Sequence, residues 1–562
     1  MPKVIPGLPG AKFLYTHSIS LALLLCFAAI FSLVPVQASP PSADTEQAGL
    51  ELPAYPAATT RSPLDQKLLS IMKDAHLAGL SAAAFQGDKI LWTRGYGWAD
   101  LRSQRPVTEN TIFRAASISK MFTATALLQL YEQGKFQLDD DISRYLGYPV
   151  RNPSYPDEKI TFRQLLTHTS SITDNGEYNQ LVENDPEQLK IVTLRELLTP
   201  DGSAFTPATF ADYPPGTQFR YSNLGTGIVG SLVEALSGER FESYCRNHIF
   251  RPLSLDAGFD PADVDRWQNI AVLYRPTADL SHFLPMRDDF QGQKPTPLQI
   301  DAARGSALGW SPAGGVHISI SDLSRFMLAH MNGGAFQNVR LLKKETVDLM
   351  DQLHWSGNGM DGFYRQKGLQ IHVTDDLVPG RRLSGHSAEA YGLIGDAYFD
   401  SDSRFGIAFL INGGEYKDSA PFYAVENRIA KTLFDELAPK SKPVPQTLRA
   451  NNGSTTLSLN NRKIIMPQPA ALFKTKAGST LFIPALSAAD AFRARMDNTG
   501  SGQTLTYSLG KNTAVITAGK AELAVNGKKI PLPQAPYFSN GQLMVPLKEL
   551  SRALNVSAAI TF

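Results

Sequence analysis

"RAASISKMF", residues 114–122, carries the spacing Ser-x-x-Lys at Ser117 and Lys120. A serine hydroxyl is a poor nucleophile near neutral pH and needs a base in contact with it. Residues three apart share one face of a helix, so Lys120 can reach Ser117 if this stretch is helical. The run is apolar nearly all round as far as Leu130, which is typical of a buried helix. Burial would lower the pKa of Lys120, and the first helical turn would offer N–H groups to a developing oxyanion.

The same spacing occurs at Ser70/Lys73 and at Ser508/Lys511, so the pattern alone does not identify a nucleophile. The first pair lies in an amphipathic helix pattern, where Lys73 is expected to face water. The second pair lies in "TYSLGKN", which is typical of a turn between strands. Context therefore favours Ser117.

The composition predicts a globular protein of two to four domains. The chain has 562 residues, of which 43% are hydrophobic and 19% charged, and its net charge is +1. This balance gives no indication of nucleic acid or an acidic polymer as a partner. Cys245 is the single cysteine outside the first 38 residues, which excludes a disulfide framework and a cysteine-based zinc site within the mature chain.

Residues 1–38 have the features of an export signal. Two lysines form a positive n-region, "SLALLLCFAAIFSLVPV" is an apolar h-region, and "VQA" ending at Ala38 resembles a cleavage site. The apolar run is short for a membrane span, which favours cleavage; an uncleaved segment would act as an N-terminal membrane anchor. Residues 39–61, rich in Pro, Ala, Ser and Thr, are predicted to be a disordered lead-in. We therefore expect a secreted or cell-wall-associated protein.

Residues 62–437 alternate helix and strand signals without a break. Their pattern predicts an α/β domain with an antiparallel sheet and a helical insert between its strands. The predicted elements are a helix at 63–79, a hairpin at 80–97 turning at Gly87-Asp88, helices at 117–134, 223–238 and 421–437, and a buried strand at 404–414.

The C-terminal part differs in kind. Residues 438–454 shift to Pro, Lys, Ser and Asn, as in a linker, and residues 455–562 contain short β-rich runs. "NNRKIIMPQPAALF" pairs with "NGKKIPLPQAPYF", and "GSTLFIPALSAADAF" pairs with "NGQLMVPLKELSRAL". Each copy is predicted to form strand, turn, strand, Pro and short helix, and the two copies to pack as one domain.

Two more motifs could complete a site around Ser117. "FRYSNLG" holds Tyr221 and Asn223 at the entry to a helix. Tyr221 could relay a proton if nearby cations lower its pKa, and Asn223 could hold Lys120 and a substrate amide. The alternative is an Asn helix cap beside a packed Tyr. "RRLSGHSAEAYG" places His386 after a strand-like run, whose edge could add a backbone N–H to an oxyanion site; the alternative is a loop histidine.

In the order Ser-x-x-Lys, Tyr-x-Asn, Gly-His-Ser, residues 65–437 resemble the class C serine β-lactamases and penicillin-binding-protein-like serine hydrolases. "LLTHTSSI" (165–172) and "SPAGGVHISISDLSRFM" (311–327) resemble two further stretches of that family. The resemblance implies an α/β sandwich, with a five-stranded antiparallel sheet flanked by helices and a separate helical region.

The resemblance also implies roles for individual residues. Ser117 would become acylated, and Lys120 and Tyr221 would share general-base and general-acid duty. Asn223, His386 and Ser387 would bind substrate, and the backbone N–H groups of Ser117 and Glu389 would form the oxyanion hole. No cofactor or metal is implied.

Three residues depart from the family pattern. His386 stands where Lys is found in the Lys-Thr-Gly form, and it is mostly neutral at pH 7, so it is a weaker partner for a substrate carboxylate. Ala388 and Ser171 stand where Gly is common. The His form is itself common among esterases and peptidases of the family.

Residues 455–562 resemble the copper amine oxidase N-terminal-like domain, a stalk-type module. Since no His follows His386 and no Cys follows Cys245, this part offers no plausible copper ligand set, and a spacer or wall-facing module is expected.

Two hypotheses follow. The first is a secreted serine hydrolase that acts through an acyl-enzyme on β-lactams, D-Ala-D-Ala-type or other D-amino-acid peptides, or small esters. The second is a non-catalytic protein that binds cell-wall peptidoglycan. The presence of Ser117, Lys120, Tyr221 and Asn223 together favours the enzyme.

Overall fold

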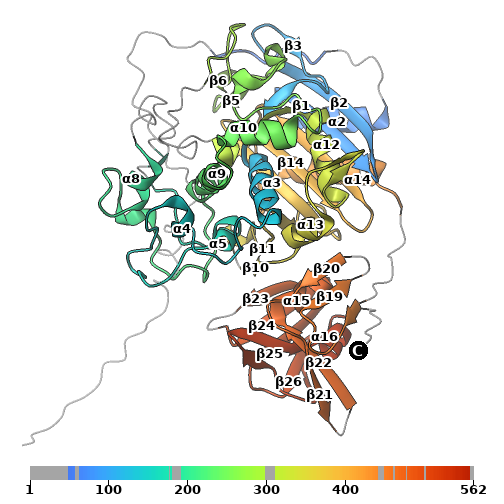
Figure 1. The fold of residues 1–562 in the computed structure, drawn as a ribbon. Coiled ribbons are helices and arrows are strands. Elements are labelled where there is room, and N and C mark those ends of the chain that lie inside the picture. Colours follow the sequence, from blue (N-terminus) through green and yellow to red (C-terminus); the bar gives the residue numbers. More distant parts are fainter. Residues whose placement is uncertain are drawn as a thin grey trace, which may run out of the picture. The chain divides into compact units, whose positions relative to one another are not determined.

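A computed structural model of the chain describes residues 49–556 except a few short segments (Figure 1). The segments left out are 57–61, 176–177, 180–191, 298–310, 358, 441–447, 460–461, 476–477 and 499–501. The predicted signal segment lies outside the described residues, and so does the beginning of the predicted lead-in. Among the helices that the structure describes, none has both the length and the apolar character needed to cross a bilayer.

In the described residues that precede the predicted linker, the chain is built on one antiparallel sheet of nine strands. Its five long strands are adjacent, as the resemblance implies, and short strands extend both edges. In spatial order the strands are β10 (Trp355–Ser356), β11 (Gln366–Lys367), β12 (His372–Thr374), β13 (Leu383–Ala390), β14 (Leu393–Asp400), β15 (Phe405–Ile411), β1 (Gly79–Gln86), β2 (Lys89–Asp100) and β3 (Arg105–Pro106).

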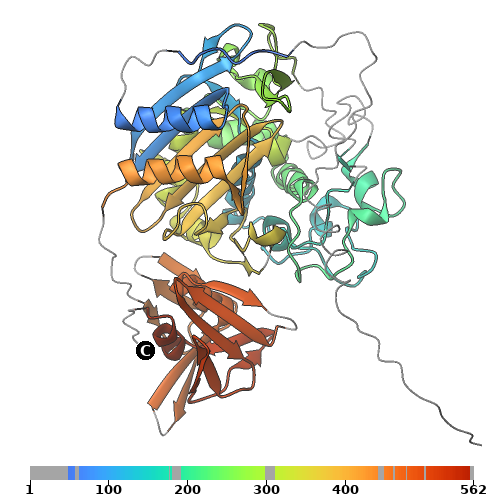
Figure 2. The same cartoon turned by 180° about the vertical axis from the view of Figure 1, so that it is seen from behind.

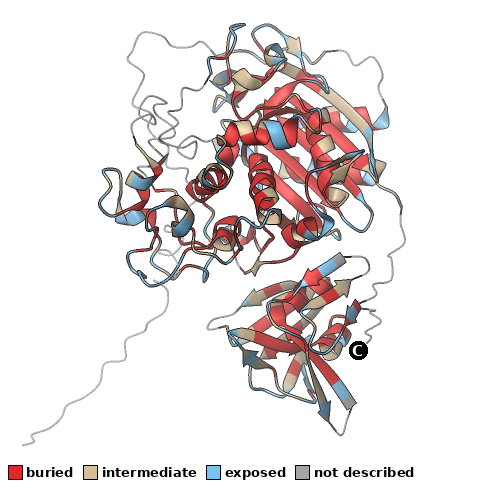
Figure 3. Ribbon diagram, viewed as in Figure 1, coloured by how far each residue is buried: buried red, intermediate tan, exposed pale blue. Residues whose placement is uncertain are grey.

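The central strands are apolar because helices cover both faces of the sheet. α2 (Pro63–Asp74) and α14 (Ala424–Leu437) lie side by side on one face (Figure 2). α12 (Ile320–Met331) packs on the other face against β1 and β15, and α3 (Ser119–Glu132) lies in the core of the same layer. Four of these strands, β1, β13, β14 and β15, are accordingly buried almost throughout, and so is α3 (Figure 3).

The helical region contains α9, which packs against α3, and several short helices. α9 (Asn223–Ser237) ends at Gly238, whose φ of 76° gives the left-handed C-cap that glycine adopts without strain. The short helices are α4 (Ser143–Leu146), α5 (Phe162–Leu166), α8 (Leu194–Leu198), α10 (Phe241–Cys245), α11 (Ser311–Gly314) and α13 (Lys344–Asp351).

The predicted hairpin at 80–97 is confirmed, with its turn at Gly87-Asp88, and so are the helices at 223–238 and 421–437 within a few residues of their predicted ends. The helix predicted at 63–79 is present but ends at Asp74, because Gly79 already begins β1. Two further predictions need correction. Part of the lead-in is ordered, because the backbone of Leu50 exchanges hydrogen bonds of 2.9 and 2.7 Å with Phe283, and Tyr55 donates one of 2.7 Å to the carbonyl of Leu77. The predicted linker contains a strand, β18 (Leu448–Ala450), which pairs with β19 (Thr456–Leu459).

The two C-terminal copies fold alike, as their sequences predict. Copy one contains β20 (Arg462–Ile465), β21 (Ala471–Thr475), β22 (Gly478–Pro484) and α15 (Ala485–Phe492). Copy two contains β27 (Lys528–Pro531), β28 (Tyr537–Ser539), β29 (Gln542–Pro546) and α16 (Leu547–Ala553). β22 pairs with β29, so the two copies share one sheet. Between them run β23 (Arg495–Asn498), β24 (Thr504–Leu509), β25 (Asn512–Thr517) and β26 (Glu522–Val525).

Candidate active site

Ser117 lies on a tight turn that precedes α3. The predicted helix does not begin at Ser117, because residues Ala116–Ile118 form a 3-10 turn and α3 starts at Ser119. Ala116 has a φ of 40°, a left-handed conformation that an alanine adopts at a cost and that is often found at functional sites. The residue before the turn is anchored to a distant segment, because the N–H of Ala115 donates a 2.7 Å hydrogen bond to the carbonyl of Val316.

The other two Ser-x-x-Lys pairs lie elsewhere, as predicted. Ser70 and Lys73 are both exposed on α2, and Lys511 is exposed in the turn between β24 and β25.

Lys120 is fully buried, and its amine lies 3.2 Å from Ser117 Oγ. The amine also contacts Asn223 Oδ1 and the carbonyl oxygen of Ala313, each at 2.8 Å. Burial lowers the pKa of Lys120 to about 7, although the charge of Asp174 raises it in part. A large fraction of Lys120 is therefore neutral near pH 7 and able to accept the proton of Ser117.

Tyr221 contacts the other side of the same oxygen. Its hydroxyl donates a 2.8 Å hydrogen bond to Ser117 Oγ. The sequence-based idea that cations lower the pKa of Tyr221 is not supported, because burial and then the neighbouring Tyr364 raise that pKa well above 10. Tyr221 is thus a neutral hydrogen-bond donor, and Lys120 is the group with the pKa of a base.

Asn223 is the first residue of α9, and Asp174, which sequence reasoning missed, holds it in place. Asp174 accepts hydrogen bonds from Ser222 Oγ (3.0 Å) and from the N–H groups of Asn223 (2.8 Å) and Leu224 (2.9 Å). A carboxylate at a helix N-terminus satisfies N–H groups that lack partners within the helix and is favoured by the helix dipole. Asp174 therefore fixes the residue that orients Lys120.

The Pro-Ala-Gly-Gly stretch supports α3 through its backbone. Thr123 Oγ1 donates to the carbonyl of Pro312 (2.6 Å), and Ser119 Oγ accepts from the N–H of Val316 (3.0 Å). Together with the bond from Lys120 to the carbonyl of Ala313, these contacts fix the first turns of α3 to residues 312–316. Sequence reasoning used this stretch as a family marker only.

His386 and Ser387 lie on β13, which packs beside the turn that carries Ser117. The His386 ring is buried, its Nδ1 lies 2.7 Å from the carbonyl of Ser387, and its centre is 6.4 Å from that of Tyr221. Burial, with the charges of Lys367 and Lys120, lowers the pKa of His386 well below 6.5, so the ring is neutral. The side chain of Glu389 is exposed at the end of the strand, while its backbone is the predicted oxyanion donor.

"LLTHTSSI" places a second neutral histidine against Tyr221. His168 stacks on the Tyr221 ring at 4.5 Å, and its Nδ1 accepts a 3.2 Å hydrogen bond from the N–H of Ser222. Burial lowers the pKa of His168 well below 6.5. Ser171 has a φ of 64°, which explains in physical terms why glycine suits this position in the family.

A buried ion pair lies three residues before Ser117. Arg114 donates to both carboxylate oxygens of Asp288 (2.8 and 3.1 Å), and His317 Nε2 lies 3.3 Å from the same carboxylate. Arg114 and His317 belong to the paired strands β4 (Ile112–Arg114) and β7 (His317–Ser319). This pairing joins the start of the Ser117 turn to the Pro-Ala-Gly-Gly stretch.

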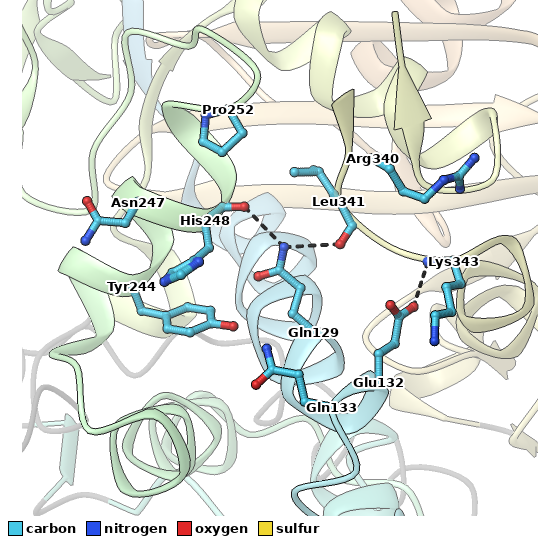
Figure 4. Close-up of a pocket in the computed structure, with 10 residues that line it drawn as sticks. All are labelled: Gln129, Glu132, Gln133, Tyr244, Asn247, His248, Pro252, Arg340, Leu341 and Lys343. Carbon is cyan, nitrogen blue, oxygen red and sulfur yellow. Dashed lines mark hydrogen bonds between the residues drawn. The ribbon is translucent and has the colours of Figure 1, made fainter. Parts of the chain in front are cut away.

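A pocket of about 460 Å³ lies at the far end of α3 (Figure 4). Gln129 Nε2 donates to the carbonyls of His248 (3.1 Å) and Leu341 (3.2 Å) in its wall. Gln129 follows Ser117 by three helical turns, so this pocket is separate from the Ser-Lys-Tyr cluster.

Two family models match the chain. The "Beta-lactamase" model matches residues 64–428, and the "Copper amine oxidase N-terminal domain" model matches residues 474–560. The protein PbpX of Bacillus subtilis (strain 168) is 30% identical over 375 residues, which cover 66% of this chain and 79% of that protein. Esterase EstB of Burkholderia gladioli is 31% identical over 221 residues, which cover 38% of this chain and 54% of that protein.

"Protein flp" of Staphylococcus aureus (strain N315) is 26% identical over 196 residues, which cover 35% of this chain and 37% of that protein. The chain thus spans little more than a third of the length of that relative. Two solved structures share the fold. The octameric penicillin-binding protein homologue from Pyrococcus abyssi has a TM-score of 0.51 at 18% identity, covering 86% of this chain and 99% of that chain. D-amino acid amidase from Ochrobactrum anthropi SV3 has a TM-score of 0.51 at 19% identity, covering 66% and 99%.

The Beta-lactamase match extends over more than half of the chain and includes every residue of the Ser-Lys-Tyr cluster. The chain belongs to the β-lactamase family.

Proposed function

We propose that this protein is a serine hydrolase that forms an acyl-enzyme at Ser117 on an amide or ester substrate. The observation that carries the proposal is the position of Ser117 Oγ, which lies 3.2 Å from the Lys120 amine and 2.8 Å from the Tyr221 hydroxyl. One contact supplies a base whose pKa is about 7, and the other supplies a neutral proton donor. Such a pair is what a hydroxyl nucleophile needs.

The two groups suit successive steps. Ser117 Oγ attacks the substrate carbonyl, and its proton moves to Lys120 Nζ. The attack forms the Oγ–C bond and gives a tetrahedral oxyanion. Collapse breaks the bond to the leaving group, which takes the proton of Tyr221, and the protonated Lys120 returns a proton to Tyr221. Water then repeats the sequence on the ester and releases the acid, so no proton is gained or lost by the enzyme.

The neutral state of His386 favours substrates without a carboxylate beside the reacting carbonyl. A lysine in its place would offer a cation, whereas His386 offers an uncharged ring at neutral pH. We therefore rank small esters and uncharged amides, including D-amino-acid amides, above β-lactams and D-Ala-D-Ala-type peptides. The names of relatives and solved structures of the fold include an esterase and a D-amino acid amidase, but also a class C β-lactamase and a β-lactamase/D-alanine carboxypeptidase, so the ranking rests on His386.

A substrate panel tests the proposal. The protein and its Ser117→Ala variant are assayed with p-nitrophenyl butyrate, D-phenylalanine amide and benzylpenicillin. Hydrolysis of the first two that is lost in Ser117→Ala supports the proposal. Absence of turnover for all three, with binding of peptidoglycan peptide that Ser117→Ala retains, would support the non-catalytic binder instead.

We also propose that the protein acts outside the cytoplasm, as its N-terminal sequence predicts, and that the C-terminal copies serve as a spacer or wall-facing module. The family match of residues 474–560 is compatible with this placement. N-terminal sequencing of the protein recovered from culture medium tests the cleavage after Ala38.

A further inference from the structure

A ring that sequence reasoning did not single out supports the catalytic tyrosine. Tyr364 stacks on Tyr221 with the ring centres 5.2 Å apart and the planes only 16° from parallel. Tyr364 follows the turn Met360–Gly362 and precedes β11, whereas His386 lies on β13. It is 4% exposed.

Tyr364 is itself held on several sides. Its ring packs edge-on against Phe363 (4.7 Å) and His372 (4.7 Å), and it lies 5.5 Å from Phe219. The fully buried amine of Lys367, for which the described residues offer no hydrogen-bond partner, lies 5.0 Å from the Tyr364 ring centre. A ring with this many close neighbours has little freedom to tilt, so it forms a fixed surface for Tyr221.

Tyr221 has two stacked ring neighbours, His168 at 4.5 Å and Tyr364 at 5.2 Å, and it needs them because its backbone alone does not fix its hydroxyl. It lies before Ser222, the N-cap of α9, in non-helical chain. The Tyr221 Oη lies on the Cβ–Cγ axis, so its position depends on χ1 and on the tilt of that axis, and a ring packed against the face of Tyr221 resists such a tilt. A displacement of about 1 Å of a reacting group can reduce a rate by about 10²-fold. A nearly parallel ring stack is attractive beyond the burial of the two rings, so it favours one position of the Tyr221 ring.

We propose that Tyr364 is a positioning residue whose ring holds the Tyr221 hydroxyl on Ser117 Oγ, so that its contribution to acylation passes through Tyr221. The inference rests on the proposed function. It predicts that loss of the Tyr364 ring slows reaction at Ser117 only while Tyr221 retains its hydroxyl.

The test is a double-mutant cycle on the full chain with a rhodamine-linked fluorophosphonate. This probe forms an Oγ–P bond with an activated serine and loses fluoride, so its rate reports attack by Ser117 independently of deacylation. Labelling rates are measured for the wild type, Tyr364→Leu, Tyr221→Phe and the double variant. Tyr364→Phe keeps the ring and is the conservative rescue; it removes only the Tyr364 hydroxyl, which hydrogen-bonds with Tyr221 and Ser387, so it separates the role of the ring from that of the hydroxyl. Phe434→Leu is the matched control, because Phe434 is 2% exposed in the same domain and its ring contacts Phe405 and Arg381.

We expect Tyr364→Leu to slow labelling by about tenfold or more, Tyr364→Phe and Phe434→Leu to label nearly as the wild type does, and Tyr364→Leu to add no further loss to Tyr221→Phe. Additive effects in the cycle, or a Tyr364→Leu rate equal to that of the wild type, would overturn the inference. If Tyr364→Leu does not fold, as judged by its melting curve, Tyr364→Met replaces it in the same cycle. A wild type that labels no faster than Ser117→Ala would overturn the proposed function and the inference together, whereas normal wild-type labelling with an additive cycle overturns the inference alone.

Discussion

Tyr221 donates a 2.8 Å hydrogen bond to Ser117 Oγ, although 104 residues separate the two in the chain. The bond exists because α9 packs against α3 and brings the residue before its N-cap to the start of α3. Lys120 reaches the same oxygen from within α3, at 3.2 Å. The serine hydroxyl therefore lies between a base on α3 and a proton donor on the segment that leads into α9.

The first prediction concerns Lys120 and pH. Since the pKa of Lys120 is lowered to about 7, labelling of Ser117 by the fluorophosphonate should rise with pH through about 7 and level off above it. Lys120→Arg should lose about 10²–10⁴-fold at every pH, because a guanidinium is not deprotonated in proteins. A wild-type rate that is flat between pH 5 and 9 would contradict the assignment of Lys120 as the base.

The second prediction concerns Asp174, which caps α9. Asp174→Ala removes hydrogen bonds to Ser222, Asn223 and Leu224 and should lower the free energy of unfolding by about 1–2 kcal/mol. It should also slow Ser117 labelling, because Asn223 loses its anchor. Asp88→Ala, in the exposed hairpin turn, is the control and should change neither quantity. Denaturant unfolding and labelling measure the two effects; loss of stability without loss of rate would show that Asp174 is structural only.

The third prediction concerns the buried pair of Arg114 and Asp288. Asp288→Ala leaves a buried guanidinium without its partner and should cost about 3–5 kcal/mol of unfolding free energy. The double variant Arg114→Met/Asp288→Leu removes both charges and should recover part of that loss. Equal stability of the single and double variants would contradict this account.

The same pair has a pH consequence. Burial alone would raise the pKa of Asp288, but the charges of Arg114 and His317 outweigh it and hold the pKa well below its ordinary range. A carboxyl with a lowered folded pKa adds stability that is present above its unfolded pKa of about 4 and is lost as the pH falls toward the folded value. Melting temperature should fall with pH below about 4 more steeply in the wild type than in the double variant.

The fourth prediction has the opposite sign and concerns Glu426 on α14. Burial raises the pKa of Glu426 to about 8. Burial, and then the negative charge of Glu426, raise the pKa of Asp396 well above its ordinary range. A carboxyl with a raised folded pKa adds stability that is present below its unfolded pKa of about 4.3 and is lost as the pH rises through about 8. Glu426→Gln should therefore be more stable than the wild type at pH 8.5, measured by denaturant unfolding. A wild-type stability that does not fall between pH 5 and 8.5 would contradict the prediction.

Local patterns predicted much of the fold. The alternating hairpin at β1–β2 and the helix stop at Gly238 depend on neighbouring residues, so the sequence showed them directly. The ordered segment at Leu50 and Tyr55 was missed because its order comes from Phe283 and Leu77, which no local pattern connects to it. Composition suggested disorder, and tertiary contacts decided otherwise.

The site shows the same division. Spacing and family resemblance identified Ser117, Lys120, Tyr221 and Asn223, which the structure brings into contact. Asp174 and Tyr364 act through hydrogen bonds and ring stacking across distant segments, and neither belongs to a motif. The sequence left open whether nearby cations lower the pKa of Tyr221, whereas in the structure burial dominates and raises it. The electrostatics of a buried group depend on how much water it loses, which a sequence does not display.

The most direct test of the account is the intact mass of the protein after incubation with p-nitrophenyl butyrate and rapid acid quench, beside Ser117→Ala and Lys120→Arg. We predict a butyryl adduct that peptide mapping places on Ser117, that is absent from Ser117→Ala and that forms far more slowly in Lys120→Arg. If no adduct forms and no p-nitrophenol is released beyond the Ser117→Ala level, or if the adduct lies on another residue, then the claim that Ser117 is an activated nucleophile is contradicted.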